Sequence, residues 1–251
     1  MGEPLLRVRG LVKRFGGLRA SDGVDLDLAR GEIHALIGPN GAGKTTLVHQ
    51  LSGALRPDAG RIDFGGVDVT RRPMHVRVRC GIARSFQVTN VFPRLTALEN
   101  VALAAQARGG SSFSFWRARS RDCAIFGQAR ATLDRVGLGA RAGIRASALA
   151  HGEQRALEIA LALATGAALL LLDEPLAGMG PGESASMVAL VASLRGETTV
   201  LLVEHDMDAV FQLADRISVM VRGRVLATGT VAEIRAHPEV RAAYLGEDGP
   251  R

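Results

Sequence analysis

One short segment constrains the fold of this chain more than any other: the run Gly-Pro-Asn-Gly-Ala-Gly-Lys-Thr-Thr at residues 38–46. It matches the pattern G-x-x-x-x-G-K-[ST], with Gly38, Gly43, Lys44 and Thr45 at the defined positions. In such a loop the glycines allow successive backbone N–H groups to point inward at phosphate oxygens. We therefore expect a phosphate-binding loop here.

The flanking residues predict the strand–loop–helix setting that this motif requires. An apolar, partly alternating run at 32–37 predicts a strand, and 47–51 has helical spacing and must end before Pro57. A helix that begins at about Lys44 would direct its positive end at the same anion. Lys44 can reach the β- and γ-phosphates, and the Thr45 hydroxyl can hold Mg²⁺. The sequence thus predicts that a nucleoside triphosphate binds to Gly38, Pro39, Asn40, Gly41, Ala42, Gly43, Lys44, Thr45 and Thr46.

Length and composition are those of an ordinary globular protein. At 251 residues the chain can bury a substantial core, and its hydrophobic fraction of 47% and charged fraction of 22% are typical of such proteins. Cys80 and Cys123 lack metal-ligand spacing and suggest no disulfide framework. The N-terminus lacks a signal-type apolar region, and the longest apolar stretch, 159–172, is broken at 165–166. We expect neither a secretory signal nor a membrane span.

The formal net charge of +6, with a sequence pI of about 10.5, is compatible with a nucleic-acid partner. However, the surplus is arginine scattered along the chain with few aromatic residues between, and a high-GC coding bias explains it equally well. Anionic ATP and lipid head groups are other partners for such a charge. We expect no nucleic-acid partner.

Strand-like and helix-like runs alternate along the chain, which predicts an α/β architecture with a mainly parallel sheet. The stretch 96–143 differs, because it is rich in Ala and Arg and has helical spacing, so it is interpreted as a helical insertion. The run 217–226 predicts a hairpin that turns at Arg222-Gly223. Further strands are predicted at 5–12, 23–28, 33–37, 61–64, 169–172 and 199–203.

Two carboxylates, Asp173 and Glu174, follow the apolar run 169–172. Ligands of an open α/β sheet bind at the carboxyl ends of the strands, so both side chains should emerge beside the phosphate loop rather than form a plain solvated turn. Asp173 can position Mg²⁺, and Glu174 can polarise the attacking water. His205 closely follows the next apolar strand. A lone histidine is more often structural, but a parallel neighbouring strand would bring this one to Glu174, where it can orient the water.

Residues 149–155 read Leu-Ala-His-Gly-Glu-Gln-Arg and precede a helical run. A small, polar entry to a helix is a potential anion site, since the first N–H groups of the helix have no partner within it. The same segment can equally be an ordinary helix cap. The residues alone favour neither interpretation.

These elements, in this order, resemble the nucleotide-binding subunit of ABC transporters over essentially the whole chain. The resemblance implies a P-loop NTPase fold, with a RecA-like core, an antiparallel β subdomain and a helical subdomain. It implies one ABC ATPase domain over 1–251. Residues of about 1–86 and 156–251 would form the core and the β subdomain, and about 87–155 the helical subdomain.

The resemblance also implies roles for single residues. Phe15 would stack on adenine, and Gln87 would lie in a loop that senses Mg²⁺ and the membrane partner. The resemblance thus makes Gln87 a third catalytic residue, with Glu174 and His205. It also makes Gln87 a third metal-binding residue, with Thr45 and Asp173. Two chains would pack head to tail, with each ATP held between the phosphate loop of one chain and the signature of the other. The signature residues that would act in trans are Ala150, His151, Gly152 and Glu153.

Some departures from the family pattern point to a particular branch. The usual signature is Leu-Ser-Gly-Gly-Gln, whereas Ala150 and His151 occupy its second and third places, and Gly180 stands where many relatives have an aspartate. The altered signature, the run Glu-His-Asp-Met and the tail 238–247 look like those of the branched-chain amino acid uptake ATPases. The insertion with Phe-Ser-Phe-Trp at 113–116 is also similar to that branch, although these residues can equally pack inside the helical subdomain.

This branch implies an ATP-hydrolysing subunit, with ATP and Mg²⁺, at the cytoplasmic face of the inner membrane. Its partners would be two transmembrane permease subunits and a second ABC ATPase, either a paralogue or another copy, with an external solute-binding protein engaged indirectly. Importers of urea or short-chain amides and the lipopolysaccharide-export ATPase are alternatives within transport. A soluble ABC ATPase that acts on nucleic acid or ribosomes is an alternative from a different class.

Overall fold

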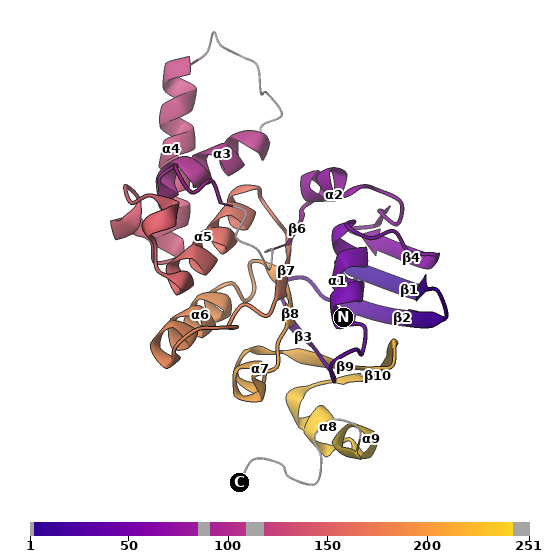
Figure 1. Ribbon diagram of the computed structural model, residues 1–251. Helices are drawn as coiled ribbons and strands as arrows, with labels where there is room; N and C mark the ends of the chain where they lie inside the picture. The colour runs from indigo at the N-terminus through magenta and orange to yellow at the C-terminus, as the bar shows by residue number, and fades with distance from the viewer. Residues whose placement is uncertain (1–2, 85–90, 109–117, 243–251) are drawn as a thin grey trace.

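The computed structural model describes residues 3–84, 91–108 and 118–242, which form two β-sheets with helices around them (Figure 1). The first sheet is antiparallel, with the strand order β2-β1-β4-β5. Along β2, buried and exposed residues alternate over most of the second half, as expected where one face of a sheet packs on a core. The strands are β1 (Leu6–Phe15), β2 (Leu18–Leu28), β4 (Ala59–Phe64) and β5 (Val67–Asp68).

The second sheet has the strand order β10-β9-β3-β8-β7-β6 and is parallel except for β10. Every residue of β3, β7 and β8 is buried, because parallel strands are covered on both faces. Arg222 and Gly223 both have positive φ, 48° and 79°, at the turn between β9 and β10, so the predicted hairpin is confirmed. The strands are β3 (Ile33–Ile37), β6 (Ile82–Arg84), β7 (Leu169–Asp173), β8 (Thr199–Val203), β9 (Arg216–Val221) and β10 (Arg224–Gly229).

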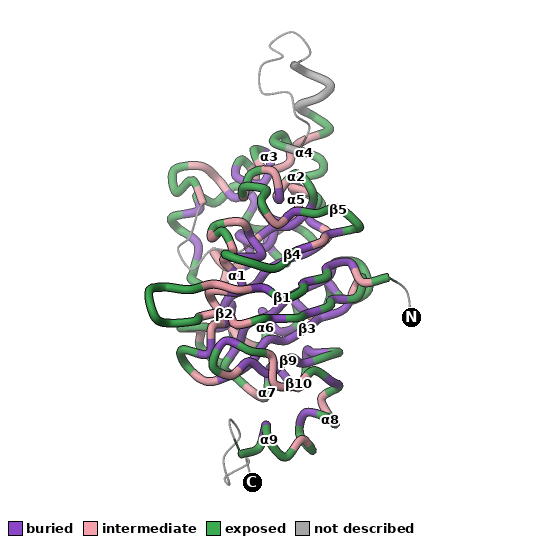
Figure 2. The backbone as a smooth tube through the Cα atoms, turned by 90° about the vertical axis from the view of Figure 1, so that its right-hand side faces the viewer, coloured by how far each residue is buried: buried purple, intermediate pink, exposed green. Residues whose placement is uncertain are grey.

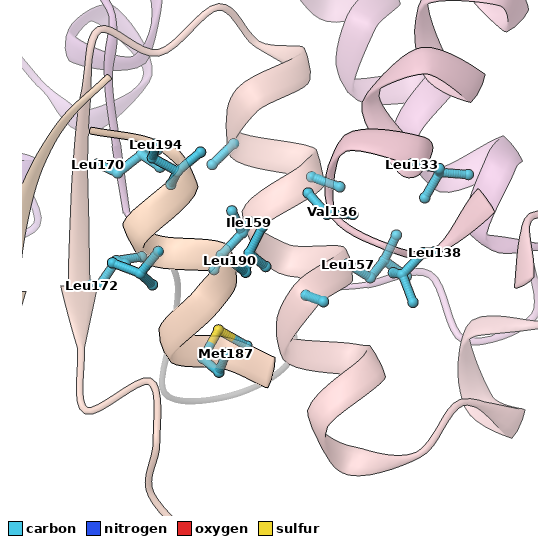
Figure 3. Close-up of a cluster of buried hydrophobic side chains, with 14 of the residues drawn as sticks. Leu133, Val136, Leu138, Leu157, Ile159, Leu170, Leu172, Met187, Leu190 and Leu194 are labelled. Carbon is cyan, nitrogen blue, oxygen red and sulfur yellow. The ribbon is translucent and has the colours of Figure 1, made fainter. Parts of the chain in front are cut away.

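Successive residues of the central strands face two different cores. Leu170 and Leu172 of β7 pack against the helices α5 (His151–Ala164) and α6 (Pro181–Ser193), as Figure 3 shows. Leu169 and Leu171 pack instead with α1 (Lys44–Ser52) and the first sheet. The parallel sheet is therefore covered by helices on one face and by α1 with the antiparallel sheet on the other. In Figure 2, buried residues make up most of β3 and β9 of this sheet.

A separate group of helices lies at one end of the molecule, at the top of Figure 1. The helices α3 (Ala97–Arg108) and α4 (Ala118–Arg135) pack on each other and on α5, and two short 3₁₀ segments, Gly139–Arg141 and Ala146–Ala148, follow them. The helical character predicted for 96–143 is confirmed within the described residues. The helix α5 runs without a break through positions 155 and 156, so it belongs to both parts of the chain, and the proposed division there stays a prediction.

A buried arginine fixes the helix that follows the phosphate loop. Arg77, fully buried on α2 (Met74–Cys80), donates from Nη1 to the carbonyl oxygens of Gln50 and Leu51, both at 2.7 Å, near the end of α1. Its Nη2 donates to Thr70 O and its Nε to Arg72 O, at 3.0 and 2.9 Å. Burial lowers the pKa of this guanidinium to about 10. A cation among the last carbonyls of a helix satisfies groups that have no partner in the helix itself.

The remaining helices, α7 (Met207–Leu213), α8 (Val231–Ala236) and α9 (Pro238–Val240), lie beside the β9–β10 edge of the parallel sheet (Figure 1). Across the described part of the chain, the helices are too short or too polar to span a bilayer.

Candidate nucleotide site

The phosphate loop lies between β3 and α1, as the sequence predicts, and close packing requires glycine at two of its positions. A Cβ on Gly38 would collide with the carbonyl oxygen of Met220, and one on Gly43 with the carbonyl oxygen of Ala20. Gly43 has φ 103° and is the N-cap of α1. The helix begins at Lys44, so its N-terminal N–H groups face the loop, and the predicted strand–loop–helix order is confirmed.

The ammonium group of Lys44 is buried inside the loop. Its Nζ donates to the carbonyl oxygens of Gly38 and Pro39, at 2.6 and 3.1 Å. Burial lowers the pKa of Lys44, whereas the charges of Glu174 and Asp173 raise it. These two carboxylates therefore lie close enough to act on the loop, which is the arrangement that the sequence predicts.

The ends of β7 and β8 bring Glu174 and His205 together. Asp173, the last residue of β7, pairs with Val203, the last residue of β8, and the N–H of Glu174 donates to Val203 O at 2.8 Å. Glu174 Oε1 lies 2.7 Å from His205 Nε2. Glu174 has φ 52°, a backbone conformation that non-glycine residues rarely adopt and that is frequent at functional sites. The predicted meeting of Glu174 and His205 is confirmed, while their chemical roles stay predictions.

Asp173 has a partner that sequence reasoning missed. Its Oδ2 lies 3.0 Å from Arg84 Nη2, and the two side chains are 0% and 7% exposed. Within the described residues, Asp173 Oδ1 and Arg84 Nε are buried without a hydrogen-bond partner. Arg84 ends β6, a short strand that the hydrophobic pattern did not predict, so the sequence carried no clear signal for this ion pair.

Glu204 is a second buried group that sequence reasoning left without a role. Its Oε1 accepts from Leu176 N at 2.8 Å and its Oε2 from His205 N at 3.0 Å. Burial raises the pKa of this carboxyl, and the nearby charge of Glu174 raises it further, against the lowering effect of its hydrogen bonds. Glu204 thus joins the turn after β7 to the turn after β8. Its position directly before His205 was the available signal.

The signature segment forms the capped start of α5. Glu153 Oε2 accepts from the N–H of Ala150 at 3.0 Å, and its Oε1 pairs with Arg141 at 2.8 Å. The N–H of Gly152 donates to Glu183 Oε1 at 3.2 Å. His151 Nε2 lies 3.4 Å from Ala177 O, in the loop that follows Glu174. Of the two interpretations of this segment, the helix cap is observed, and it leaves the anion-site interpretation open.

The structure does not bring the signature to the phosphate loop of the same chain. Among the described residues, no hydrogen bond or ion pair joins Ala150–Glu153 to the loop at 38–46. Phe15 lies at the β1–β2 turn and is 50% exposed, with Lys13 Nζ 5.7 Å from its ring centre. Gln87 lies outside the described residues, as does the run at 113–116.

A glycine loop lies between a strand and a helix, with a buried lysine, and two carboxylates follow another parallel strand of the same sheet. This combination defines a P-loop nucleoside triphosphatase. Comparisons with known proteins narrow this class. The model of the ABC transporter family matches residues 21–177, and the model described as branched-chain amino acid ATP-binding cassette transporter matches 224–250.

Individual relatives are similar to this chain over nearly its whole length. The high-affinity branched-chain amino acid transport ATP-binding protein LivG of Salmonella typhimurium is 43% identical, with 98% of this chain and 100% of LivG covered. The ADP conformation of MJ1267, an ATP-binding cassette of an ABC transporter, has a TM-score of 0.84 and 30% identity, with 98% and 100% covered. The dimeric post-hydrolysis structure of the cassette MJ0796, bound to ADP and Pi, has a TM-score of 0.75 and 25% identity, with 90% and 98% covered. The chain belongs to the ABC transporter family as an ATP-binding subunit, an ATPase, and the predicted P-loop fold with a helical subdomain is confirmed.

Proposed function

We propose that this chain is the ATP-hydrolysing subunit of an importer for branched-chain amino acids. The contact of Glu174 with His205, at the carboxyl ends of the paired strands β7 and β8, supports hydrolysis. The C-terminal match at 224–250 and the relatives named for branched-chain amino acid transport support the solute class. ATP is the substrate, held by residues 38–46 with Phe15 stacked on its base.

The chain's own residues supply the hydrolytic chemistry. Glu174 accepts the proton of the attacking water, and His205, next to its carboxylate, orients that water and contacts the γ-phosphate. Lys44 offsets the negative charge that develops on the phosphate oxygens. Glu204 holds the backbone on both sides of this pair, through Leu176 and His205.

The residues present fit a magnesium ion. Asp173 Oδ1, buried without a partner in the described part of the chain, and the hydroxyl of Thr45 are oxygen donors of the kind that Mg²⁺ prefers. No group of three or more His, Cys, Asp or Glu side chains that could hold a metal occurs among the described residues. A single carboxylate and a hydroxyl suit an ion that also takes phosphate oxygens and waters as ligands. Such an ion neutralises charge on the phosphates.

The second ATP-binding subunit completes each site. In the chain itself the signature is capped and separate from the phosphate loop, and a related cassette is known as a dimer. We therefore assign Ala150, His151, Gly152 and Glu153 to the ATP of a partner chain, either a second copy or a paralogue. The backbone N–H groups at the start of α5 replace the missing serine hydroxyl.

A groove between the core and the helical group fits a permease helix. It has a volume of about 460 Å³ and lies between α2, β6, α3 and α5, with a mainly apolar lining that includes Val78, Ala83, Phe92, Leu103 and Leu161. Phe92 and Leu103 are 59% and 42% exposed, more than apolar side chains without a partner usually are. Two permease subunits docked in this way would hold two ATPase chains at the cytoplasmic face of the membrane, with a solute-binding protein on the other side.

Co-purification tests this assignment. The tagged chain is isolated from detergent-solubilised membranes and its companions are identified by mass spectrometry. Two membrane-spanning permeases and a second ABC ATPase, with an external amino-acid-binding protein after cross-linking, are the expected companions. A control chain with Phe92→Asp and Leu103→Asp should lose the permeases and keep ATP binding. Recovery with nucleic acid or ribosomes, and no membrane protein, would overturn the transport assignment.

A further inference from the structure

One polar side chain belongs both to the groove and to the nucleotide site. Arg84 lines the apolar groove described above, and its Nη2 lies 3.0 Å from Asp173 Oδ2. Arg84 is the last residue of β6, and Asp173 is the last residue of β7, with which β6 pairs in parallel. The two side chains therefore lie at the same edge of the sheet, one beside the groove and the other beside the phosphate loop.

The ion pair is almost completely buried, which makes its charges effective over short distances. Its side chains are 7% and 0% exposed, and burial strengthens electrostatic interactions because water screens them less. Burial is the main cause that lowers the pKa of both Lys44 and His49 on α1. The charge of Asp173 acts against this lowering at each of them, and the charge of Arg84 lowers the pKa of His49 further. A change of charge at Arg84 therefore alters the electrostatic potential at α1, the helix that follows the phosphate loop.

Arg84 also competes with any other cation at Asp173. A positive charge fixed on one carboxylate oxygen disfavours a second positive charge on the other, by the same Coulomb rule that shifts pKa values. The pairing leaves Oδ1 as the free oxygen of Asp173 among the described residues. Arg84 thus both orients the carboxylate and weakens its hold on a divalent ion.

We propose that Arg84 is a positioning residue that links the groove to Asp173, so that a permease helix seated in the groove changes the affinity of Asp173 for a divalent cation. This inference rests on the proposed function, which supplies the permease as the occupant of the groove. The link is direct, because a single side chain contacts both sites.

The first test measures metal-dependent nucleotide binding without turnover. Each variant carries Glu174→Gln, which blocks hydrolysis, and the Kd of ATP is measured by calorimetry with Mg²⁺ and with EDTA. The metal ratio, which is the Kd of ATP with EDTA divided by the Kd with Mg²⁺, reports how much the metal strengthens ATP binding. Arg84→Gln removes the competing charge and keeps an amide that can donate to Asp173, so we expect the ratio to rise about fivefold. Arg84→Lys keeps the charge and should leave the ratio within about twofold of the parent.

The direction of this change separates the proposal from a merely structural role. A loss of local structure in Arg84→Gln would weaken ATP binding and lower the metal ratio, and an unchanged ratio would likewise overturn the proposal. Melting curves of both variants show whether the fold is kept. If the parent chain itself does not bind ATP, the proposed function fails instead, so the two failures are distinguishable.

The second test uses the assembled transporter. The metal ratio is compared between the free chain and the complex with its permeases, in the parent and in Arg84→Gln. We expect a difference of several-fold between free chain and complex in the parent and none in Arg84→Gln. An equal difference in both would show that the permease acts on the site through other residues and would overturn the link through Arg84.

Discussion

At the scale of single residues, the site depends on side chains held in positions that cost free energy. Glu174 has a left-handed backbone, held by its N–H bond to Val203 O, and its carboxylate meets His205. Such a conformation costs on the order of 1–3 kcal/mol and persists only where the surroundings enforce it. Here the surroundings are two parallel strands and the buried carboxylate of Glu204. The strain is consistent with a residue positioned for chemistry.

Replacing the carboxylate of Glu174 should separate binding from turnover. Glu174→Gln keeps the size of the side chain and removes the base, so we expect kcat for ATP hydrolysis to fall by about 10²- to 10⁴-fold. The Kd of ATP should stay within about threefold, because the phosphate loop is unchanged. Phosphate release and calorimetry measure the two quantities. The matched variant Glu239→Gln, at an exposed position on α9, should alter neither quantity, and near-normal turnover in Glu174→Gln would exclude Glu174 as the base.

At the scale of elements, α1 is positioned from both ends. Its start is the phosphate loop, and its end is held by Arg77 of α2, which also bonds the carbonyl oxygens of Thr70 and Arg72. The buried side chain of Gln50 on α1 accepts from Ser21 Oγ at 2.7 Å and so joins the helix to the antiparallel sheet. The phosphate loop is therefore supported by elements well separated in the sequence.

Arg77 should be important for stability although it is distant from the chemistry. Arg77→Met removes the guanidinium bonds to four carbonyl oxygens, so we expect the free energy of unfolding to fall by about 3 kcal/mol. Urea unfolding, followed by circular dichroism, measures this change. Arg79→Met, at an exposed position on the same helix, is the control and should change stability by less than about 0.5 kcal/mol. Equal effects of both substitutions would contradict the anchoring role.

The buried carboxyl of Glu158 on α5 predicts a pH effect. Burial raises its pKa, against the lowering effect of Arg155, whose Nη1 lies 3.2 Å from Oε2. A carboxyl whose pKa is higher in the folded than in the unfolded chain stabilises the fold at low pH, and this stabilisation is lost as the pH rises through the folded-state pKa. Glu158→Gln is neutral at every pH. The wild type should therefore lose more stability than the variant between pH 4.5 and pH 7.5.

Thermal melting at the two pH values tests this effect. We expect the Tm difference, variant minus wild type, to be larger at pH 7.5 by about 1–4 °C. A difference that stays constant or shrinks with rising pH would show that the ion pair with Arg155 outweighs burial. The pH dependence common to both chains cancels in this comparison.

At the scale of the whole molecule, the local motifs and the meeting of Glu174 with His205 were predictable, whereas other long-range pairs were not. The phosphate loop and the turn at Arg222-Gly223 are contiguous in the sequence, so their residue types alone determine the backbone. The meeting of Glu174 with His205 required one further assumption, that β7 and β8 are parallel neighbours, which the structure confirms. The pairs Arg84–Asp173 and Glu183–Gly152 depend on how distant segments pack, and no local pattern encodes that packing.

The proposed function implies two half-sites in the molecule as a whole, which the same chain does not join. The phosphate loop, Asp173, Glu174 and His205 form one, and the capped start of α5 forms the other. His151 and Glu183 connect the second half-site to the loop after Glu174, through Ala177 O and Gly180 N. A change at Glu174 can therefore reach the start of α5 within one chain through these contacts.

The central claim is that hydrolysis by this chain drives the import of branched-chain amino acids. Uptake of radiolabelled leucine is measured in cells that lack the chain and are complemented with the wild type, with Glu174→Gln, or with Cys123→Ser, a change at an exposed position. We expect the wild type and Cys123→Ser to restore uptake and Glu174→Gln to leave it at the level of the deletion. Leucine uptake that is the same with and without the chain would contradict the claim.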